Sequence, residues 1–283
     1  MTPEHHAARR TGLLVAKAGG LFLSFDIPLV RLTDGSLWPV LALRSLSTFI
    51  VALLAMAAIR FVLGRRDAFV PGRAGLLAGL FYGLSTMAFV AAVYHTTTAN
   101  VVFIVAFSPM FAALLSWIFM KEVPSRSTLV TMGAMVAGVV IIVGNGLSSG
   151  HVFGDLLAVA AALLIAAGLT TTRASGQPMG FVPLLASAIP AAISLVFAWP
   201  EGFAMQAPGW ALFDGLVMMP LAFWLLATAP RFLPAAEVGM FYLLETVLAP
   251  VWMWTIFREV PSTATLLGGT LIIGALLVHS LAG

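Results

Sequence analysis

The chain has 283 residues, of which 61% are hydrophobic and only 9% are charged. Soluble domains carry about 25% charged residues, so this composition excludes a soluble globular protein and indicates an integral membrane protein. The net charge of +3 does not indicate a nucleic-acid partner, because the basic residues are spread over short loops. The absence of cysteine excludes disulfides and cysteine-based metal sites, and the five histidines form no metal-ligand pattern.

The N-terminal segment superficially resembles a signal peptide, because MTPEHHAARR precedes an apolar run. That run, Thr11–Val30, is longer than the apolar region of a signal peptide, and no small-residue cleavage site follows it. We therefore expect it to be retained as the first membrane helix.

Ten segments are apolar and long enough to cross a bilayer, which requires about 20 residues of helix. In chain order they are Thr11–Val30, Leu37–Ile59, Ala74–Val93, Thr98–Met120, Ser127–Val143, Leu156–Thr172, Phe181–Ala198, Trp210–Ala229, Ala235–Phe257 and Thr263–His279. The connections are short and contain Gly, Pro, Ser or charged residues. We expect an all-α integral membrane protein with ten transmembrane helices.

The loop charges predict the orientation of these spans. With ten spans both termini share one side, and that side carries ten of the loop lysines and arginines. The other side carries Arg31 and Arg258. Because short cytoplasmic loops are enriched in Lys and Arg, both termini are expected in the cytoplasm.

An internal repeat divides the chain into two halves. WIFMKEVPS at Trp117–Ser125 recurs as WTIFREVPS at Trp254–Ser262, and the same offset of 137 aligns 71–143 with 208–280. We expect a first repeat over residues 1–145 and a second over 146–283. Five spans per repeat is an odd number, so the repeats are inverted, an arrangement typical of transporters with a site near the midplane between them. The alternative is a duplicated helical scaffold without a pathway.

Small residues and prolines mark the helix faces and possible bends. Gly75, Gly79 and Gly83 recur at four-residue spacing in the third span, which favours close packing within one chain over dimerisation. Prolines stand inside five spans, at positions Pro28, Pro109, Pro190, Pro220 and Pro250. Each frees a backbone carbonyl and permits either a hinge or a static bend.

Six Asp, Glu, Lys or Arg residues lie within the spans, where a charge costs at least ~2.5 kcal/mol; they are Lys17, Asp26, Arg44, Asp214, Glu237 and Glu245. Glu245 is ~15 Å into the ninth span, too deep for its side chain to reach water, which favours a cavity-lining role. We expect Lys17 to pair with Glu245 or Glu237, and Asp26 to form a structural ion pair with Arg44. A buried carboxylate is also able to carry a proton.

Neutral polar and aromatic residues complete the candidate cavity. The candidates for substrate binding are Lys17, Tyr82, Thr86, Asn100, Phe103, Ser108, Trp224, Phe241, Tyr242 and Glu245. Asn100 and Ser108 occupy the repeat positions of Glu237 and Glu245, which indicates one cavity shared by the fourth and ninth spans. The alternative for the aromatic residues is packing or contact with lipid. Trp117, Trp252 and Trp254, near span ends, are typical of the interfacial aromatic belt.

Motifs of catalysis are absent from the sequence. It contains no GxxxxGK[ST] loop, no HExxH and no GxSxG, so we expect neither ATP hydrolysis nor another enzymatic activity, and no cofactor.

The end of the fourth span, SPMFAALLSWIFMKEVPS, resembles the EamA domain. The second copy, LETVLAPVWMWTIFREVPS, keeps the pattern at Pro250 and Glu259, although Thr246 stands where that family usually has Pro. Ten spans with two such domains are similar to the drug/metabolite transporter superfamily, and most similar to the YddG-type exporters of aromatic and other amino acids. The resemblance implies a monomeric exporter of amphipathic metabolites in the bacterial inner membrane.

The sequence is compatible with three functions. They are an amino acid exporter, a proton-coupled exporter of cationic drugs on the same fold, and a membrane scaffold that transports nothing. Glu122 and Glu259, in the repeated block, fall on opposite faces of the membrane and cannot share a site. We expect both to close corners between adjacent spans, each followed by a Pro suited to the first turn of a helix.

Overall fold

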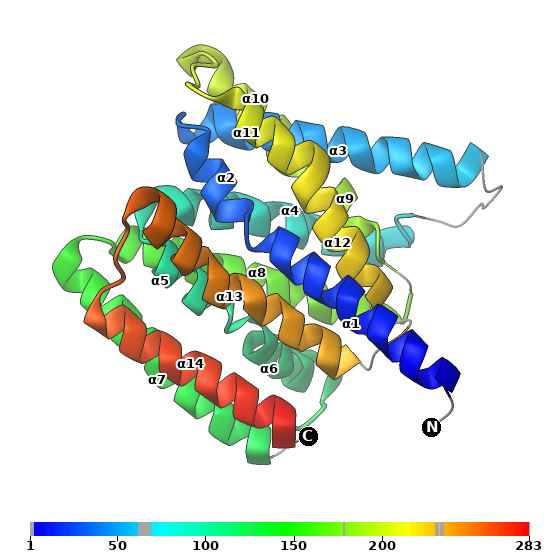
Figure 1. Ribbon diagram of the computed structural model, residues 1–283, viewed down its shortest axis with the longest axis vertical. Coiled ribbons are helices and arrows are strands. Elements are labelled where there is room, and N and C mark those ends of the chain that lie inside the picture. Colours follow the sequence, from blue (N-terminus) through cyan, green and yellow to red (C-terminus); the bar gives the residue numbers. More distant parts are fainter. Residues whose placement is uncertain are drawn as a thin grey trace.

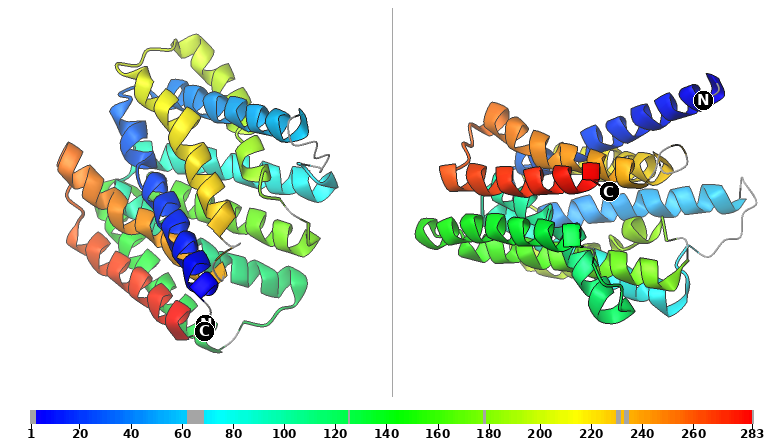
Figure 2. Two further views of the ribbon diagram at one scale, coloured as in Figure 1. Left: turned by 45° about the vertical axis from the view of Figure 1, so that its right-hand side comes forward. Right: turned by 90° about the horizontal axis from the view of Figure 1, so that it is seen from below.

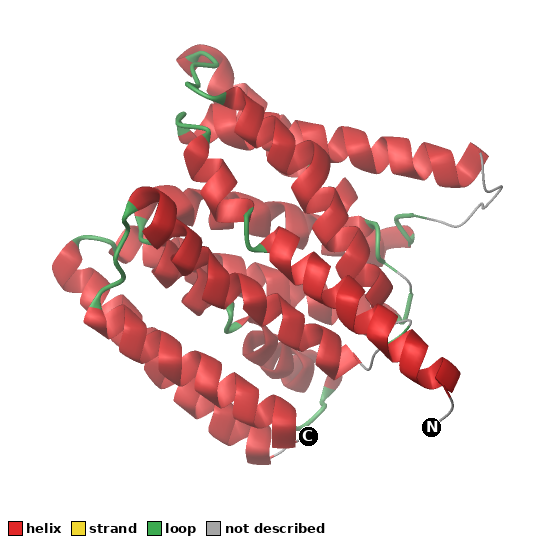
Figure 3. Ribbon diagram, in the orientation of Figure 1, coloured by secondary structure: helices red, strands yellow, loops and turns green. Residues whose placement is uncertain are grey.

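The computed structural model describes residues 3–61, 69–124, 126–177, 179–229, 232 and 235–282. Within these ranges it describes no side chain for residues 3–9, 127, 146–149, 227, 235–240, 242–243 and 279–282. The described residues are almost entirely helical, apart from one isolated β-bridge between Gly35 and Met205 (Figure 3).

The helices follow one another along the chain with short connections (Figure 1). They are α1 (Pro3–Leu23), α2 (Asp26–Leu32), α3 (Leu37–Phe61), α4 (Gly72–His95), α5 (Thr98–Val105), α6 (Ser108–Met120), α7 (Arg126–Ser149), α8 (Val152–Ser175), α9 (Val182–Leu185), α10 (Ala188–Glu201), α11 (Pro208–Phe213), the π-helical turn η1 (Asp214–Met218), α12 (Met219–Thr228), α13 (Ala235–Phe257) and α14 (Thr263–Ala282).

The ten predicted spans are all helical. Eight segments of the described chain are long and apolar enough to cross a membrane, and the shorter apolar helices 244–257 and 263–278 occupy the ninth and tenth predicted spans. The fold is therefore an all-α membrane protein. The beginning of α1 and the end of α14 lie at the same end of the bundle (Figures 1 and 2), as an even number of spans requires.

Four of the five span prolines stand next to a helix interruption. Pro28 follows the break between α1 and α2, Pro109 the break between α5 and α6, and Pro190 the break between α9 and α10. Pro220 is the second residue after the π-helical turn η1, whereas Pro250 lies inside an uninterrupted α13. The missing N–H of proline and its clash with the carbonyl four residues earlier explain why the breaks fall just before it.

The helices pack in pairs that obey the internal repeat. The closest pairs are α4 with α8, α7 with α14, α3 with α10, and α1 with α12. The repeat makes α4 equivalent to α12 and α8 equivalent to α1, so the α4–α8 and α12–α1 pairs correspond to each other. It also makes α3 equivalent to α10 and α7 equivalent to α14, so each of these two pairs joins equivalent helices. This is the contact pattern of a two-fold axis relating the repeats. The α7–α14 pair lies side by side in both views of Figure 2.

The small-residue stripe of the third span is used for packing inside the chain. A Cβ at Gly83 of α4 would lie 2.9 Å from the carbonyl oxygen of Ala186, at the break between α9 and α10. The small residues therefore let α4 pack closely against the segment of α9 and α10, as small residues do between membrane helices.

The repeated EVPS block forms the same corner twice. Lys121 and Arg258 both adopt a left-handed conformation with φ of 58°. The N–H of Glu122 then bonds the carbonyl of Ser116 at 3.4 Å, and the N–H of Glu259 bonds that of Met253 at 3.3 Å. Each corner is thus a helix C-cap of the Schellman type.

Candidate functional site

A buried ion cluster joins the continuous helix α3 to two interrupted spans, one broken between α1 and α2 and one containing the π-helical turn η1. Arg44 of α3 contacts Asp26 of α2, with Nη2 2.6 Å from Oδ1, and its Nε donates to Asp214 Oδ2 at 2.6 Å. Asp26 and Arg44 are each 3% exposed and Asp214 is fully buried. The ion pair expected between Asp26 and Arg44 is present, and Asp214 is an additional partner.

Local backbone irregularities bring the two aspartates to Arg44. Asp26 is the first residue of α2, directly after the break, so its carboxylate is favoured by the free N–H groups of the helix start. Asp214 begins the π-helical turn η1. Its neighbour Gly215 lies so close to α3 that an added Cβ would collide with the Arg44 carbonyl and with Ser47 Oγ. Only glycine allows η1 to approach Arg44 in this way.

A third carboxylate belongs to the same electrostatic neighbourhood. Glu245 of α13 is within Coulombic range of both Asp26 and Arg44. Two members of this set, Asp26 and Arg44, come from the first repeat, and Asp214 and Glu245 come from the second. The set therefore combines one guanidinium and three carboxyl groups at the junction of the repeats.

Some hydrogen-bonding atoms of the ion cluster have no partner among the described residues. Nη1 of Arg44 and Oδ1 of Asp214 are buried without a hydrogen bond, and Oδ1 of Asp26 meets Arg44 only as an ion pair. Buried polar atoms are nearly always satisfied, so each such atom calls for a ligand, a water or a proton.

A second buried polar network surrounds Asn100 of α5. The Asn100 amide donates to Asp155 Oδ1 of α8 at 2.9 Å and to Thr96 Oγ1 at 3.2 Å, and its own oxygen accepts from Thr265 of α14 at 2.7 Å. Thr96 also donates to Asp155 at 2.6 Å. All four residues are buried. Asn100 thus ties three helices of both repeats together.

The two glutamates of the repeated block have different partners, and both partners lie in the other repeat. Glu259 accepts a hydrogen bond from the backbone N–H of Thr98 at 2.6 Å, at the start of α5. Glu122 pairs with Arg173 of α8 at 2.8 Å, where both side chains are exposed. Glu259 therefore has two roles: its side chain caps the start of α5 in the opposite repeat, and its backbone N–H takes part in the C-cap of α13.

The remaining candidates are spread over several environments. Tyr82 packs against Gly168 of α8, and Thr86 donates back to the Tyr82 carbonyl at 3.1 Å. The ring of Phe103 lies against Gly269 of α14. The described contacts of Tyr82 and Phe103 are with neighbouring helices.

Ser108 and Phe241 serve the backbone and the packing of their helices. The Ser108 hydroxyl bonds the Val105 carbonyl, which is the carbonyl that Pro109 leaves free. The backbone of Phe241 lies against Gly20 of α1. The Tyr242 side chain lies outside the described residues, as does that of Glu237.

Lys17 and Trp224 have exposed side chains, and Trp224 is 60% exposed. Among the described residues no ion pair joins Lys17 to Glu245; the other expected partner, Glu237, has its side chain outside the described residues, so that pairing stays a prediction. The charged neighbours of Glu245 are Asp26 and Arg44 instead.

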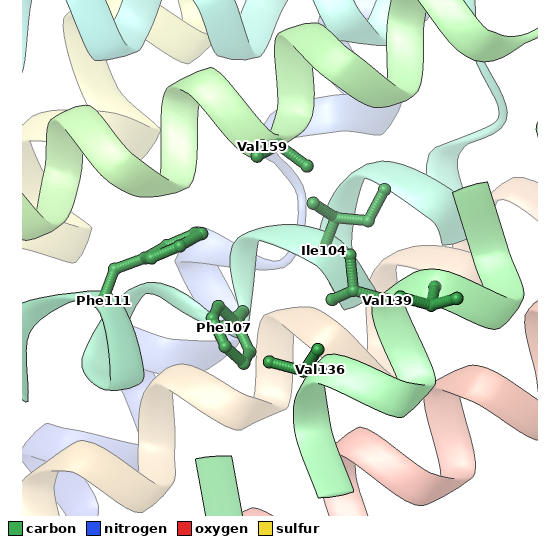
Figure 4. A pocket seen from close by; sticks show the side chains of 7 residues that line it. Ile104, Phe107, Phe111, Val136, Val139 and Val159 are labelled. Atoms are coloured by element: carbon green, nitrogen blue, oxygen red, sulfur yellow. The ribbon is translucent and has the colours of Figure 1, made fainter. Parts of the chain in front are cut away.

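An apolar cavity of about 240 Å³ lies beside the break between α5 and α6 (Figure 4). It is lined by Ile104, Phe107, Phe111, Val136, Val139, Val140 and Val159. None of the candidate residues lines it. Its hydrocarbon walls suit an apolar group and offer nothing to an ion.

Two features of the site could not be read from the sequence. Asp155 sits at the start of the sixth span, where a carboxylate is usually solvated, yet it is fully buried. Trp252, expected in the interfacial belt, instead donates to Ser24 Oγ at 3.0 Å and stacks on Phe25 with ring centroids 4.9 Å apart. The break between α1 and α2 provides this partner, and no local pattern shows it.

The chain matches a protein family twice. Residues 10–144 match the EamA-like transporter family, and residues 152–281 match it again. The protein is therefore a helical membrane transporter built from two repeats. It belongs to the EamA-like transporter family.

The fold is also similar to solved structures. One, described only as "Crystal structure of protein", has a TM-score of 0.66 and 19% sequence identity, and covers 97% of this chain and 98% of that chain. At this identity the likeness establishes the fold alone. No curated protein matches the chain.

Proposed function

We propose that the protein exports small amphipathic metabolites, above all amino acids including aromatic ones, by alternating access between its two repeats. The resemblance to YddG-type exporters motivates the substrate class and the outward direction. In this proposal the protein is a monomer in the bacterial inner membrane, with both termini in the cytoplasm. The ten-to-two distribution of loop Lys and Arg supports that orientation.

The observation that carries the proposal is the ion cluster at the junction of the repeats. A zwitterion in a low-dielectric site needs a partner for each of its charges. Arg44 is the buried cation available to a carboxylate, and Glu245 is a carboxylate available to an ammonium group. The cluster draws on both repeats, so a substrate held there contacts both moving parts.

The other candidates have supporting roles in the proposal. Lys17 and Asn100 are further polar partners, and Tyr82, Phe103, Phe241 and Tyr242 hold the apolar side chain of the substrate. Ser108, Thr86 and Trp224 complete the set. The alternative for Phe103 and Tyr82 is the interhelical packing described above.

A second candidate function is proton-coupled export of cationic compounds. The excess of carboxyl groups over guanidinium in the cluster favours it, because a cationic substrate and a proton compete for the same negative charges. A cationic substrate needs Glu245 but not Arg44, whereas a zwitterion needs both.

Counterflow in proteoliposomes tests the proposal. Vesicles loaded with unlabelled phenylalanine and containing the purified protein are expected to take up labelled phenylalanine faster than protein-free vesicles. Glu245→Gln and Lys17→Met are expected to slow this exchange, while Glu122→Gln, at the exposed pair, serves as the matched control. Wild-type rates in both cavity variants would place the site elsewhere, and exchange of cationic drugs alone would favour the second function.

A further inference from the structure

The ion cluster contains more carboxyl groups than its single guanidinium can neutralise. Asp26, Asp214 and Glu245 all interact electrostatically with one another or with Arg44. The neighbouring helices α11 and α12 contain no ionisable residue. Full ionisation would leave a net charge of −2 inside the membrane, because Arg44 is the one cation among the described electrostatic neighbours of the three carboxyl groups. Charge of this kind is removed by protonation or by a bound cation.

The geometry of the two aspartates indicates which ligand is missing. One guanidinium holds the carboxyl groups of Asp26 and Asp214 together, because Arg44 Nη2 is 2.6 Å from Asp26 Oδ1 and Arg44 Nε is 2.6 Å from Asp214 Oδ2, and the two carboxyl groups interact with each other. Two ionised carboxylates are acceptors only, so they cannot bond each other unless one of them carries a proton. Oδ1 of Asp214 is buried without a hydrogen bond, and Oδ1 of Asp26 is buried with Arg44 Nη2 as its ion-pair partner alone. A proton between the two groups supplies the missing donor.

We propose that Asp26 and Asp214 share one proton, and that these two residues, with Arg44 and Glu245, form the proton-binding site of the transporter. Binding converts one carboxylate and a proton into a carboxylic acid, which donates to the other carboxylate. Arg44 then faces a pair with a single negative charge and neutralises it. Glu245 is the remaining carboxyl group and binds either a second proton or the ammonium group of a substrate.

The position of the pair explains how proton binding would bias the conformation. Asp26 begins α2 in the first repeat, and Asp214 begins η1 in the second. The shared proton holds these two segments together, and its loss leaves two like charges in contact. The deprotonated pair therefore favours a conformation in which α2 and η1 separate. This coupling to transport rests on the proposed function, whereas the binding of the proton does not.

Infrared spectroscopy of the purified full-length protein tests the shared proton directly. Surface carboxyl groups are ionised at neutral pH, so a protonated-carboxyl stretching band at that pH reports a buried acid. We expect such a band in the wild type, with a shift in D2O and a further shift when aspartate is labelled with ¹³C. The label tests the folded wild-type chain, so this result does not depend on the stability of any variant.

Variants then assign the band. Asp26→Asn and Asp214→Asn should each abolish the part of the band that shifts with ¹³C-aspartate, whereas Asp155→Asn, in the second buried network, and Glu122→Gln, on the surface, should leave that part in place. Gel filtration and thermal unfolding show that each variant is folded. The proposal is overturned if the wild type has no band at neutral pH that shifts with ¹³C-aspartate, or if that aspartate band survives both substitutions, or if only Glu245→Gln removes it.

A transport measurement separates this inference from the proposed function. An imposed pH gradient is expected to raise the rate of substrate exchange severalfold in the wild type, and the ratio of rates with and without the gradient should fall to one in Asp214→Asn. Glu122→Gln should keep the wild-type ratio. Absence of exchange for every substrate, with the band present, would refute the proposed function alone; exchange without the band would refute the shared proton alone.

Discussion

Arg44 Nε donates to Asp214 Oδ2 at 2.6 Å, across 170 residues of sequence and from one repeat to the other. Both side chains are at least 96% buried. This contact holds α3 against the π-helical turn η1, and the same Arg44 also contacts Asp26, directly after the break between α1 and α2. Any motion of one repeat against the other must either carry this pair as a unit or break it.

Removal of one member of the buried pair should destabilise the protein strongly. Arg44→Met leaves Asp26 and Asp214 without their cation, and a buried charge without its partner costs about 3–5 kcal/mol. We expect thermal unfolding in detergent to occur at a clearly lower temperature than in the wild type. Asp214→Asn should have a smaller effect, because Arg44 keeps Asp26 as a partner.

Glu122→Gln is the matched control for this series. It removes one member of the exposed Glu122–Arg173 pair, and exposed pairs contribute about 0–1 kcal/mol. An unfolding temperature of Arg44→Met equal to that of Glu122→Gln would show that the buried cluster does not stabilise the fold.

Gly215 should be intolerant of any side chain. A Cβ at this position meets the Arg44 carbonyl and Ser47 Oγ, so Gly215→Ala must push η1 away from α3 and lengthen the Arg44–Asp214 contact. We expect a loss of stability of about 1–3 kcal/mol, as for overpacked cores. Gly133→Ala in α7, where nothing lies within 4 Å of an added Cβ, should be neutral or stabilising. Similar unfolding curves for the two variants would contradict the close approach.

Much of this architecture was predictable from the sequence, and the reasons are local. Apolar length located the spans, and four of the five span prolines lie next to a helix interruption, because both effects act within a few residues. Pro250 shows the limit, since α13 continues through it. The Asp26–Arg44 pair was predictable because consecutive spans place both residues at similar depth.

The rest of the candidate site depends on tertiary structure. The role of Asp214 follows from the π-helical turn and from Gly215, which together bring it to Arg44. Asp155 is buried because Thr96 and Asn100, from the opposite repeat, donate to it. Neither the turn nor these donors has a sequence pattern that a hydropathy analysis detects.

Glu259 should stabilise the start of α5 from the opposite repeat. Its carboxylate accepts the N–H of Thr98, a charge-assisted bond at the positive end of a helix. We expect Glu259→Ala to reduce stability by about 1–2 kcal/mol. Glu122→Ala, at the equivalent repeat position, loses only the exposed contact with Arg173 and should have a smaller effect. Equal effects would mean that the cap contributes nothing.

The predicted orientation can be tested because the natural chain has no cysteine. Val260→Cys lies in the connection between α13 and α14, and Gln177→Cys lies after α8, at the opposite end of the bundle. In intact bacterial cells an impermeant maleimide is expected to label Val260→Cys, and to label Gln177→Cys only after permeabilisation. The reverse labelling would place the termini outside.

Counterflow of labelled phenylalanine into proteoliposomes tests the central claim most directly, because it asks whether the cluster between the repeats carries transport. Wild-type protein and Glu122→Gln are predicted to exchange phenylalanine well above protein-free vesicles, and Glu245→Gln, folded to the same extent, is predicted to lose most of that exchange. Exchange by Glu245→Gln at the wild-type rate, or no exchange by the wild type, would contradict the account.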